Sequence, residues 1–369
     1  MSLLLLDGFD EYDEVTVSAG LNARWTLGYR ERPTFVAGRF SGRAIARQAA
    51  LRSNGDITTE VGGTNTELFY GIAIKSVTLP AVSDRLAFIK STEDATILGE
   101  VSVLASGAVE ITVNGLTATS GASKITANTW HYLELRLKVD PSVGVFEVRV
   151  DTTVEATING DTGNDIINVV GFTGGYLSTA PVVYYDDIYV ADTTGGAGEV
   201  VTYAGIVRID TLPLNGDVAS GSVPIPPGFG FIGGATTTYT KVDDFLSADT
   251  ILEASIPPPT SPLTAFISRH TKDTFATVGL GTPIVIGIAA ELNVKGTTPV
   301  SDLPFNVSAV PAVTGVTTVH DTAVNATLIG QVSKAVAGMY SQASTDSNAG
   351  VAWTATTVDA LELQTELII

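Results

Sequence analysis

The strongest constraint in this sequence is a series of short alternating apolar and polar runs, separated by turn-forming residues. In WHYLELRLKVD (130–140), leucines at every second position alternate with Tyr, Glu, Arg and Lys, which places the leucines on one face of a strand. FEVRVD (146–151) alternates in the same way. Such runs predict antiparallel strands with one buried and one solvated face. Their spacing of roughly ten residues predicts a sandwich or jelly roll.

Turn signals and composition agree with an all-β chain. VNG (113–115) and ING (158–160) are typical of turns between strands. The sequence has 37 Gly and only 2 Met, and it is rich in the β-branched residues that favour strands. It contains no Cys, which excludes disulfides, thiolate nucleophiles and cysteine-based metal sites.

Charge and hydropathy exclude several classes of partner. The net charge of −19 argues against binding to nucleic acid or to an anionic membrane surface. No apolar stretch is long enough for membrane insertion. The N-terminal SLLLLDGFDEY has too short an apolar run for a signal peptide, and acidic residues follow it.

The pattern changes at DTTGGAGE (192–199), a polar, glycine-rich stretch typical of a connector. We therefore predict two domains, residues 1–195 and residues 196–369. The second part contains proline-rich stretches, an apolar run at 282–296, a segment at 316–342 that suits strand or helix, and a terminal strand. The expected fold class is all-β, with an N-terminal jelly-roll sandwich followed by a smaller, mostly-β domain.

An acidic pair lies within the strand-like run YYDDIYVAD (184–192). In a regular strand, Asp186 and Asp187 point to opposite faces, so they cannot act as a close carboxylate pair. We expect one to face water and the other to cap a turn or to bond neighbouring backbone groups. This interpretation predicts that YYDDIYVAD is the last strand of the first domain.

Catalytic signatures are weak. Glu134, Glu147 and Asp151 lack the spacing of the paired carboxylates that retaining glycosidases place on one strand. The three histidines, at 131, 270 and 320, are isolated from one another in sequence, and neither a G-x-S-x-G elbow nor a Walker lysine is present. We therefore expect a non-enzymatic protein and keep a glycan-degrading enzyme as the disfavoured alternative.

Two kinds of binding residue remain as candidates. Calcium is the only cofactor considered, and NGDTGND (159–165) offers the oxygen ligands Asp161, Asn164 and Asp165. The acidic residues at 10, 11, 13 and 14 suit either calcium or a charged strand edge that resists strand addition. The aromatic residues available to stack on sugar rings are Trp25, Tyr29, Tyr70, Tyr176, Tyr184 and Tyr185, and the first four are the proposed glycan contacts. Most aromatics of a sandwich lie in the core, and Trp130 is expected there.

Several motifs of residues 1–195 together resemble the concanavalin A-like lectin and glucanase jelly roll, in its laminin-G-like version. They are LLLLDGFDEY, the turn in AGRFSGRAIA (37–46), NTWHYLELRLKV (128–139), the hairpin FEVRVDTTVEATING (146–160) and the closing strand YYDDIYVAD. In this family the closing strand pairs beside the first strand. The order of these motifs, followed by GEVVTYAGIVRIDTLPLNGD (198–217) and the late AWTATTVDAL (352–361), resembles a group of tailed-bacteriophage virion proteins.

That resemblance implies a structural component of a virion, associated with the tail or decorating the capsid. Its implied partners are other virion proteins and host surface polysaccharide, and its implied location is the virion. A symmetric homo-oligomer, such as a trimer, is expected from the general preference for closed symmetry. A carbohydrate-binding, lectin-like module is the alternative function.

Overall fold

The computed structural model describes two compact units, Met1–Asp210 and Thr211–Ile369. In the first unit the described residues are 3–9, 25–27, 33–40, 42–47, 56–92, 97–173, 182–193 and 203–209; in the second they are seven strands. Within these ranges every regular element is a β-strand, and no membrane-spanning helix is found there. The predicted all-β class is confirmed. Residues 203–209 belong to the first unit, so the division lies after Asp210 rather than after residue 195.

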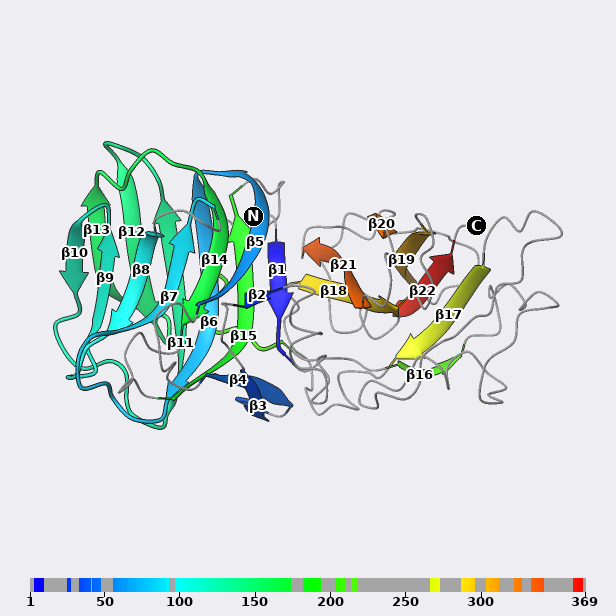
Figure 1. Cartoon of the computed structure of the whole chain (residues 1–369), viewed down its shortest axis with the longest axis horizontal. Helices are drawn as coiled ribbons and strands as arrows, with labels where there is room; N and C mark the ends of the chain where they lie inside the picture. Colours follow the sequence, from blue (N-terminus) through cyan, green and yellow to red (C-terminus); the bar gives the residue numbers. More distant parts are fainter. Residues whose placement is uncertain are drawn as a thin grey trace. The chain divides into compact units, whose positions relative to one another are not determined.

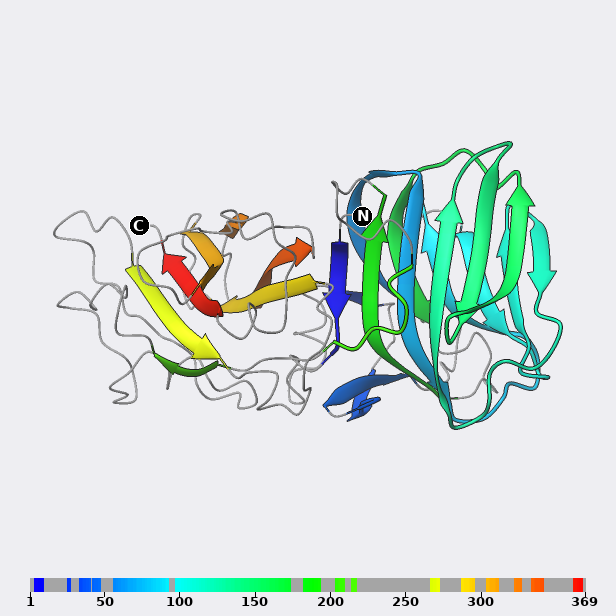
Figure 2. The ribbon, with the colours of Figure 1, turned by 180° about the vertical axis from the view of Figure 1, so that it is seen from behind.

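The first unit is a sandwich of two antiparallel sheets that face one another (Figures 1 and 2). Sheet A has the order β13-β12-β11-β6-β15-β4-β3, with β1 also paired to β15, and sheet B has the order β10-β9-β8-β7-β14-β5-β2. The strands of sheet A are β1 (Leu3–Asp7), β3 (Thr34–Ala37), β4 (Arg43–Arg47), β6 (Glu67–Ser76), β11 (Trp130–Lys138), β12 (Gly144–Val150), β13 (Thr153–Gly160) and β15 (Val183–Asp192). The strands of sheet B are β2 (Thr26–Leu27), β5 (Asp56–Asn65), β7 (Asp84–Lys90), β8 (Ile97–Val103), β9 (Val109–Val113), β10 (Leu116–Thr119) and β14 (Ile167–Thr173).

The hydrophobic core lies between the two sheets and follows the predicted alternation. Leu133, Leu135 and Leu137 of β11 are all buried and belong to one core cluster with residues of both sheets. Tyr70 of β6 crosses this core, because its hydroxyl donates a hydrogen bond to the Gly171 carbonyl of β14, 3.4 Å away. The two sheets are therefore joined by apolar packing and by polar contacts that cross the core.

Most of the local motifs form the predicted structures. The sequence VNG (113–115) is the turn between β9 and β10, with Asn114 and Gly115 at positive φ. The residues of ING do not form a turn themselves, because they end β13 and pair with β12. The predicted hairpin FEVRVDTTVEATING is present as β12 and β13 and turns at Asp151 and Thr152, both with positive φ. The closing strand β15 pairs with β1, as the resemblance implied.

The described strands of the second unit form two antiparallel sheets. One sheet has the order β16-β17-β22-β19-β20, and the other pairs β18 with β21. Their bounds are β16 (Leu214–Asp217), β17 (Phe266–Lys272), β18 (Gly287–Lys295), β19 (Leu303–Pro311), β20 (Thr322–Ala326), β21 (Ser333–Ser341) and β22 (Leu361–Leu367). The segment 316–342, for which strand and helix were both open, contains the strands β20 and β21, and the predicted terminal strand is β22.

Candidate functional site

The outer face of sheet A presents side chains in rows, because the antiparallel register sets residues of β11, β6 and β15 opposite one another. The rows are Trp130–Lys75–Tyr184, Tyr132–Ala73–Asp186 and Glu134–Gly71–Tyr189, each in the order β11–β6–β15. The middle strand contributes Ala and Gly to the second and third rows, so large side chains from both flanking strands can lean over it. Polar and aromatic groups are thus concentrated on this face.

Residues 203–209, which we call the strap, cross this outer face. The Ala204 amide donates to the Tyr189 hydroxyl at 3.2 Å, and the Gly205 amide donates to Glu134 Oε1 at 2.7 Å. The Tyr189 hydroxyl itself donates to the same Oε1, also at 2.7 Å. Glu134 and Tyr189 are almost fully buried as a result, although the alternating pattern of β11 predicted a solvated position for Glu134. That part of the prediction is wrong because the strap covers the third row.

An aromatic contact fixes the beginning of the strap. The guanidinium of Arg149 lies 3.6 Å from the centroid of the Tyr203 ring. The same ring meets Phe69 of β6 edge-on, with centroids 5.1 Å apart. Burial, followed by the nearby Glu147 carboxylate, raises the pKa of the Tyr203 hydroxyl, so this residue contacts the sheet as a neutral ring.

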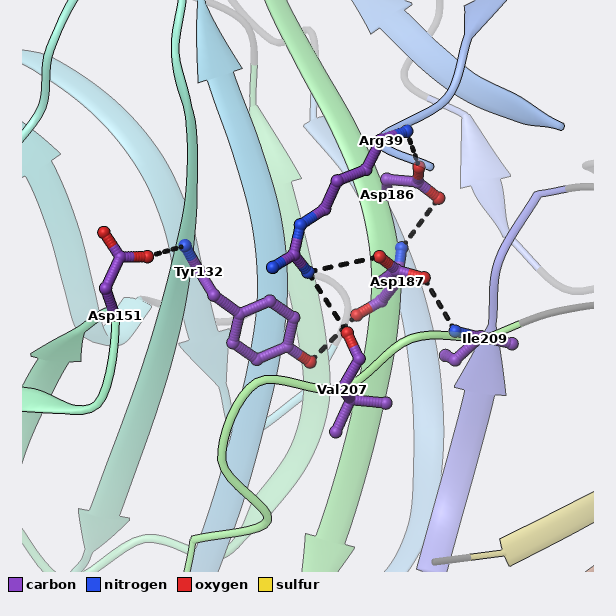
Figure 3. Close-up of polar contacts among 7 residues, drawn as sticks. All are labelled: Arg39, Tyr132, Asp151, Asp186, Asp187, Val207 and Ile209. Carbon is purple, nitrogen blue, oxygen red and sulfur yellow. Dashed lines mark hydrogen bonds and ion pairs between the residues drawn. The ribbon is translucent and has the colours of Figure 1, made fainter. Parts of the chain in front are cut away.

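The other end of the strap is held by Asp187 and Arg39 (Figure 3). Asp187 Oδ1 accepts a hydrogen bond from the Ile209 amide at 2.7 Å, and Oδ2 forms an ion pair with Arg39 Nη1 at 3.3 Å. The same Arg39 nitrogen donates to the Val207 carbonyl at 3.1 Å. The Tyr132 hydroxyl donates to the Asp187 carbonyl at 3.0 Å. Four segments distant in sequence therefore meet at Asp187.

The interpretation of the acidic pair needs correction, because both carboxylates are buried and neither faces water. The pairing of β15 with β6 shifts register between Asp186 and Tyr189, and Asp187 has a φ of 49°. This β-bulge breaks the strict alternation on which the prediction rested. Asp186 accepts bonds from the backbone amides of Arg39 and Asp187, both at 2.8 Å. The expected backbone bonding is thus correct for Asp186.

Glu134 has the electrostatics of a carboxyl held in a dry, hydrogen-bonded environment. Burial raises its pKa above the ordinary value of 4.5, and the bonds from Tyr189 and Gly205 with the charge of Arg149 oppose this only in part. Because the pKa is raised in the folded state, the protonated form favours folding at pH values below about 4.5, and this contribution is lost as pH rises through the folded pKa.

We therefore expect Glu134→Gln to gain stability relative to the wild type as the pH rises from 4 to 7, because glutamine keeps an acceptor oxygen but carries no charge. Glu134→Ala should instead lose about 2–3 kcal/mol at pH 7, because it leaves the Tyr189 hydroxyl and the Gly205 amide without their acceptor. Urea unfolding of the full chain at a series of pH values measures both. A Gln variant with a pH-independent difference from the wild type would contradict the assignment of a raised pKa.

Several of the aromatic residues predicted to stack on sugars are core residues, Tyr185 among them. Trp25 and Tyr70 are fully buried, and the Trp25 indole donates to Asp7 Oδ2 at 2.7 Å. Both rings are core side chains, so the prediction that they stack on sugars is wrong. Tyr29 and Tyr176 lie outside the described residues, and their predicted role stays a prediction.

The proposed calcium ligands lie in an exposed loop. Asp161, Asn164 and Asp165 are exposed, and Asp161 Oδ1 accepts a bond from the Gly163 amide at 2.9 Å. Within the described ranges no three His, Asp or Glu side chains gather as they would around a metal ion. The acidic residues at 10–14 lie outside those ranges. Calcium binding therefore stays a prediction without a described cluster to support it.

The remaining acidic residues weighed for catalysis have separate partners. Glu147 accepts a bond from Arg149 Nε at 3.0 Å. Asp151 Oδ2 lies 2.7 Å from His131 Nδ1; because His131 Nε2 accepts a bond from the Thr126 amide, the proton lies on Nδ1 and is donated to Asp151. Both carboxylates are thus engaged in local contacts, as Glu134 is engaged by the strap.

The first row of the outer face contains two aromatic residues, of which Tyr184 is among the sugar-stacking candidates from the sequence and Trp130 is not. Trp130, expected in the core, is only half-buried, as is Tyr184. Their ring centroids are 6.4 Å apart at an angle of 50°, although their strands are separated by β6. The two rings therefore lean toward one another across Lys75. We call Trp130, Lys75 and Tyr184 the ring patch.

No protein-family model matches the chain, and no curated protein matches it. Among solved structures, this chain is similar to the alginate lyase A1-II′, a member of polysaccharide lyase family 7. The alignment covers 46% of this chain and 95% of the lyase, with 14% sequence identity and a TM-score of 0.34. The chain is also similar to domain 4 of an extracellular arabinanase from Geobacillus stearothermophilus, solved in complex with arabinotriose. The alignment covers 52% of this chain and 92% of that domain, with 16% sequence identity and a TM-score of 0.32.

A sialidase aligns with 53% of this chain at 8% identity and a TM-score of 0.40, and the match spans 19% of the sialidase. These similarities are too distant to assign a function to this chain.

Proposed function

We propose that this chain is a non-enzymatic component of a tailed-bacteriophage virion that contacts host surface glycans through the outer face of sheet A. The observation on which the glycan contact rests is the ring patch, because two half-buried aromatic rings beside a cation suit the apolar face and the polar rim of a sugar. The patch lies on three neighbouring strands of one sheet, and such a platform positions side chains more rigidly than a loop.

The strap supports a binding role rather than a hydrolytic one for the rest of this face. Retaining glycosidases need two carboxylates about 5 Å apart flanking the scissile bond. Here Glu134 is covered by Gly205, and Asp187 holds Ile209 and Arg39. Carboxylates engaged in this way anchor a segment of the chain, and the ring patch lies apart from them in the first row.

The proposal of a virion component rests on the order of motifs in the sequence. It is supported by the pairing of the closing strand β15 with β1 and by the arrangement of a sandwich followed by a second β-unit. Mass spectrometry and a cryo-EM map of purified particles test it, and particles that lack the chain would refute it. Light scattering of the purified chain tests the proposed homo-oligomer, for which a trimer is one expected form.

We expect Trp130→Ala to weaken glycan binding at least tenfold, a loss of about 1.4 kcal/mol, because it removes the larger ring of the patch. A glycan array followed by calorimetry on the glycans that bind measures the change. Phe40→Ala is the matched control, since it removes a ring that is 52% exposed and lies outside the patch. Equal binding by the Trp130 variant and the wild type would place the glycan site elsewhere.

A further inference from the structure

Lys75 differs from most other cations of the first unit, because among the described residues no carboxylate lies at ion-pair distance from it. Described ion pairs are formed by cations that include Arg39, Arg85, Lys90, Lys124, Arg136 and Arg149. In a chain with 39 acidic and 20 basic residues, potential partners are abundant. In the part of the chain that the structure describes, this lysine nevertheless contacts two aromatic rings and forms no ion pair.

The two rings hold the ammonium group in place. Lys75 Nζ lies 5.2 Å from the centroid of Tyr184 and 5.9 Å from that of Trp130. Both distances lie within the range at which a cation is attracted to the face of an aromatic ring. Because the rings restrict the side chain, little further conformational entropy is lost when a ligand binds to the ammonium group.

The acidic group nearest along β15 is engaged elsewhere. Asp186, in the next row, accepts bonds from the backbone amides of Arg39 and Asp187. The side chain between it and Tyr132 in that row is Ala73, which has no charge. Lys75 therefore forms no ion pair with a described group of its own row or of the next row.

We propose that the ring patch binds carboxylated sugars, with Lys75 pairing with the carboxylate of a uronate or sialate residue while Trp130 and Tyr184 contact the ring. This inference rests on the proposed glycan-binding function and adds the class of ligand. A neutral sugar would leave the ammonium group covered without a partner, which costs free energy. A carboxylated sugar supplies the missing anion through a charge-assisted hydrogen bond.

The test uses the full chain on an array of uronate- and sialate-bearing glycans, printed beside the same glycans after carboxyl reduction. We expect wild-type binding to the carboxylated forms and at least tenfold weaker binding after reduction. Lys75→Gln should lose a similar factor on the carboxylated forms and nothing on the reduced forms, because glutamine cannot form the charge-assisted hydrogen bond to the carboxylate. Lys75→Arg, which keeps the charge, is the matched control and should retain most of the binding.

The outcomes separate the two proposals. Equal binding to carboxylated and reduced glycans, or equal losses on both in Lys75→Gln, would overturn the carboxylate assignment and leave glycan binding intact. Carboxylate-dependent binding that is unchanged in both Trp130→Ala and Lys75→Gln would overturn the placement at the ring patch. A wild-type chain that binds no glycan on the array would refute both proposals.

Discussion

Replacing Asp187 with alanine is expected to lower the free energy of unfolding of the first unit by about 3–5 kcal/mol, because it leaves a mostly buried guanidinium without its partner. The side chains of Asp187 and Arg39 are 3% and 12% exposed. Little water can therefore reach the Arg39 guanidinium to replace the lost carboxylate. The Ile209 amide loses its acceptor in the same variant. Alanine is also unfavourable at a φ of 49°.

Urea unfolding of the full chain, in a Trp353→Phe background, reports on the first unit through Trp25 and Trp130. Asp187→Asn is the matched control, since asparagine tolerates this backbone conformation and keeps an acceptor for Ile209 while removing the charge. We expect its loss to be smaller than that of alanine, with faster hydrogen exchange in the strap in both variants. An alanine variant as stable as the wild type would show that the strap is not anchored at Asp187.

The fold of the first unit was largely predictable because its strands obey a local rule. The alternation of β11 and β12 reports directly which side chains face the core, and Leu133, Leu135 and Leu137 are buried as predicted. The hairpin of β12 and β13 lies where the motif FEVRVDTTVEATING predicts it, but the position of its turn at Asp151 and Thr152 was less predictable. Two non-glycine residues with positive φ leave a weak sequence signal.

The candidate site was poorly predictable because it depends on contacts between segments distant in sequence. The alternating pattern of β11 predicts that Tyr132 and Glu134 lie on a solvent-exposed face of the sheet. The pattern contains no information about residues 203–209, which cover that face. The bulge at Asp187 also defeats a prediction based on alternation. One extra residue in the strand reverses which face of the sheet the following side chains occupy. One signal was available: two adjacent acids inside an apolar strand require partners if buried.

The aromatic residues illustrate a related limit. Trp25 and Tyr70 were chosen as sugar contacts and are core residues, whereas Trp130 was assigned to the core and is half-buried on the outer face. The alternation within WHYLELRL does place Trp130 on the same face as Tyr132 and Glu134 and opposite the leucines. Applying that rule strictly would have indicated an outward-facing tryptophan, so this error came from a general preference for buried aromatics.

We expect Gly71→Ala to destabilise the first unit by about 3–5 kcal/mol, through overpacking and the loss of a buried hydrogen bond. A Cβ atom at this position would lie 2.0 Å from Cε1 of Tyr189 and 2.8 Å from the Tyr132 hydroxyl. The Tyr189 ring must therefore move away from β6, and its hydroxyl then loses Glu134. The same urea unfolding experiment measures the loss.

A double-mutant cycle with Tyr189→Ala identifies the cause. If the clash with the ring is responsible, Gly71→Ala should cost far less in the Tyr189→Ala background than in the wild type, and the coupling should be among the larger values seen for residues in contact, about 2–3 kcal/mol. Gly121→Ala is the matched control, because a Cβ there meets nothing within 4 Å. Additive losses in the cycle would mean that the cost comes from another contact, such as the Tyr132 hydroxyl 2.8 Å from the added Cβ, rather than from the Tyr189 ring.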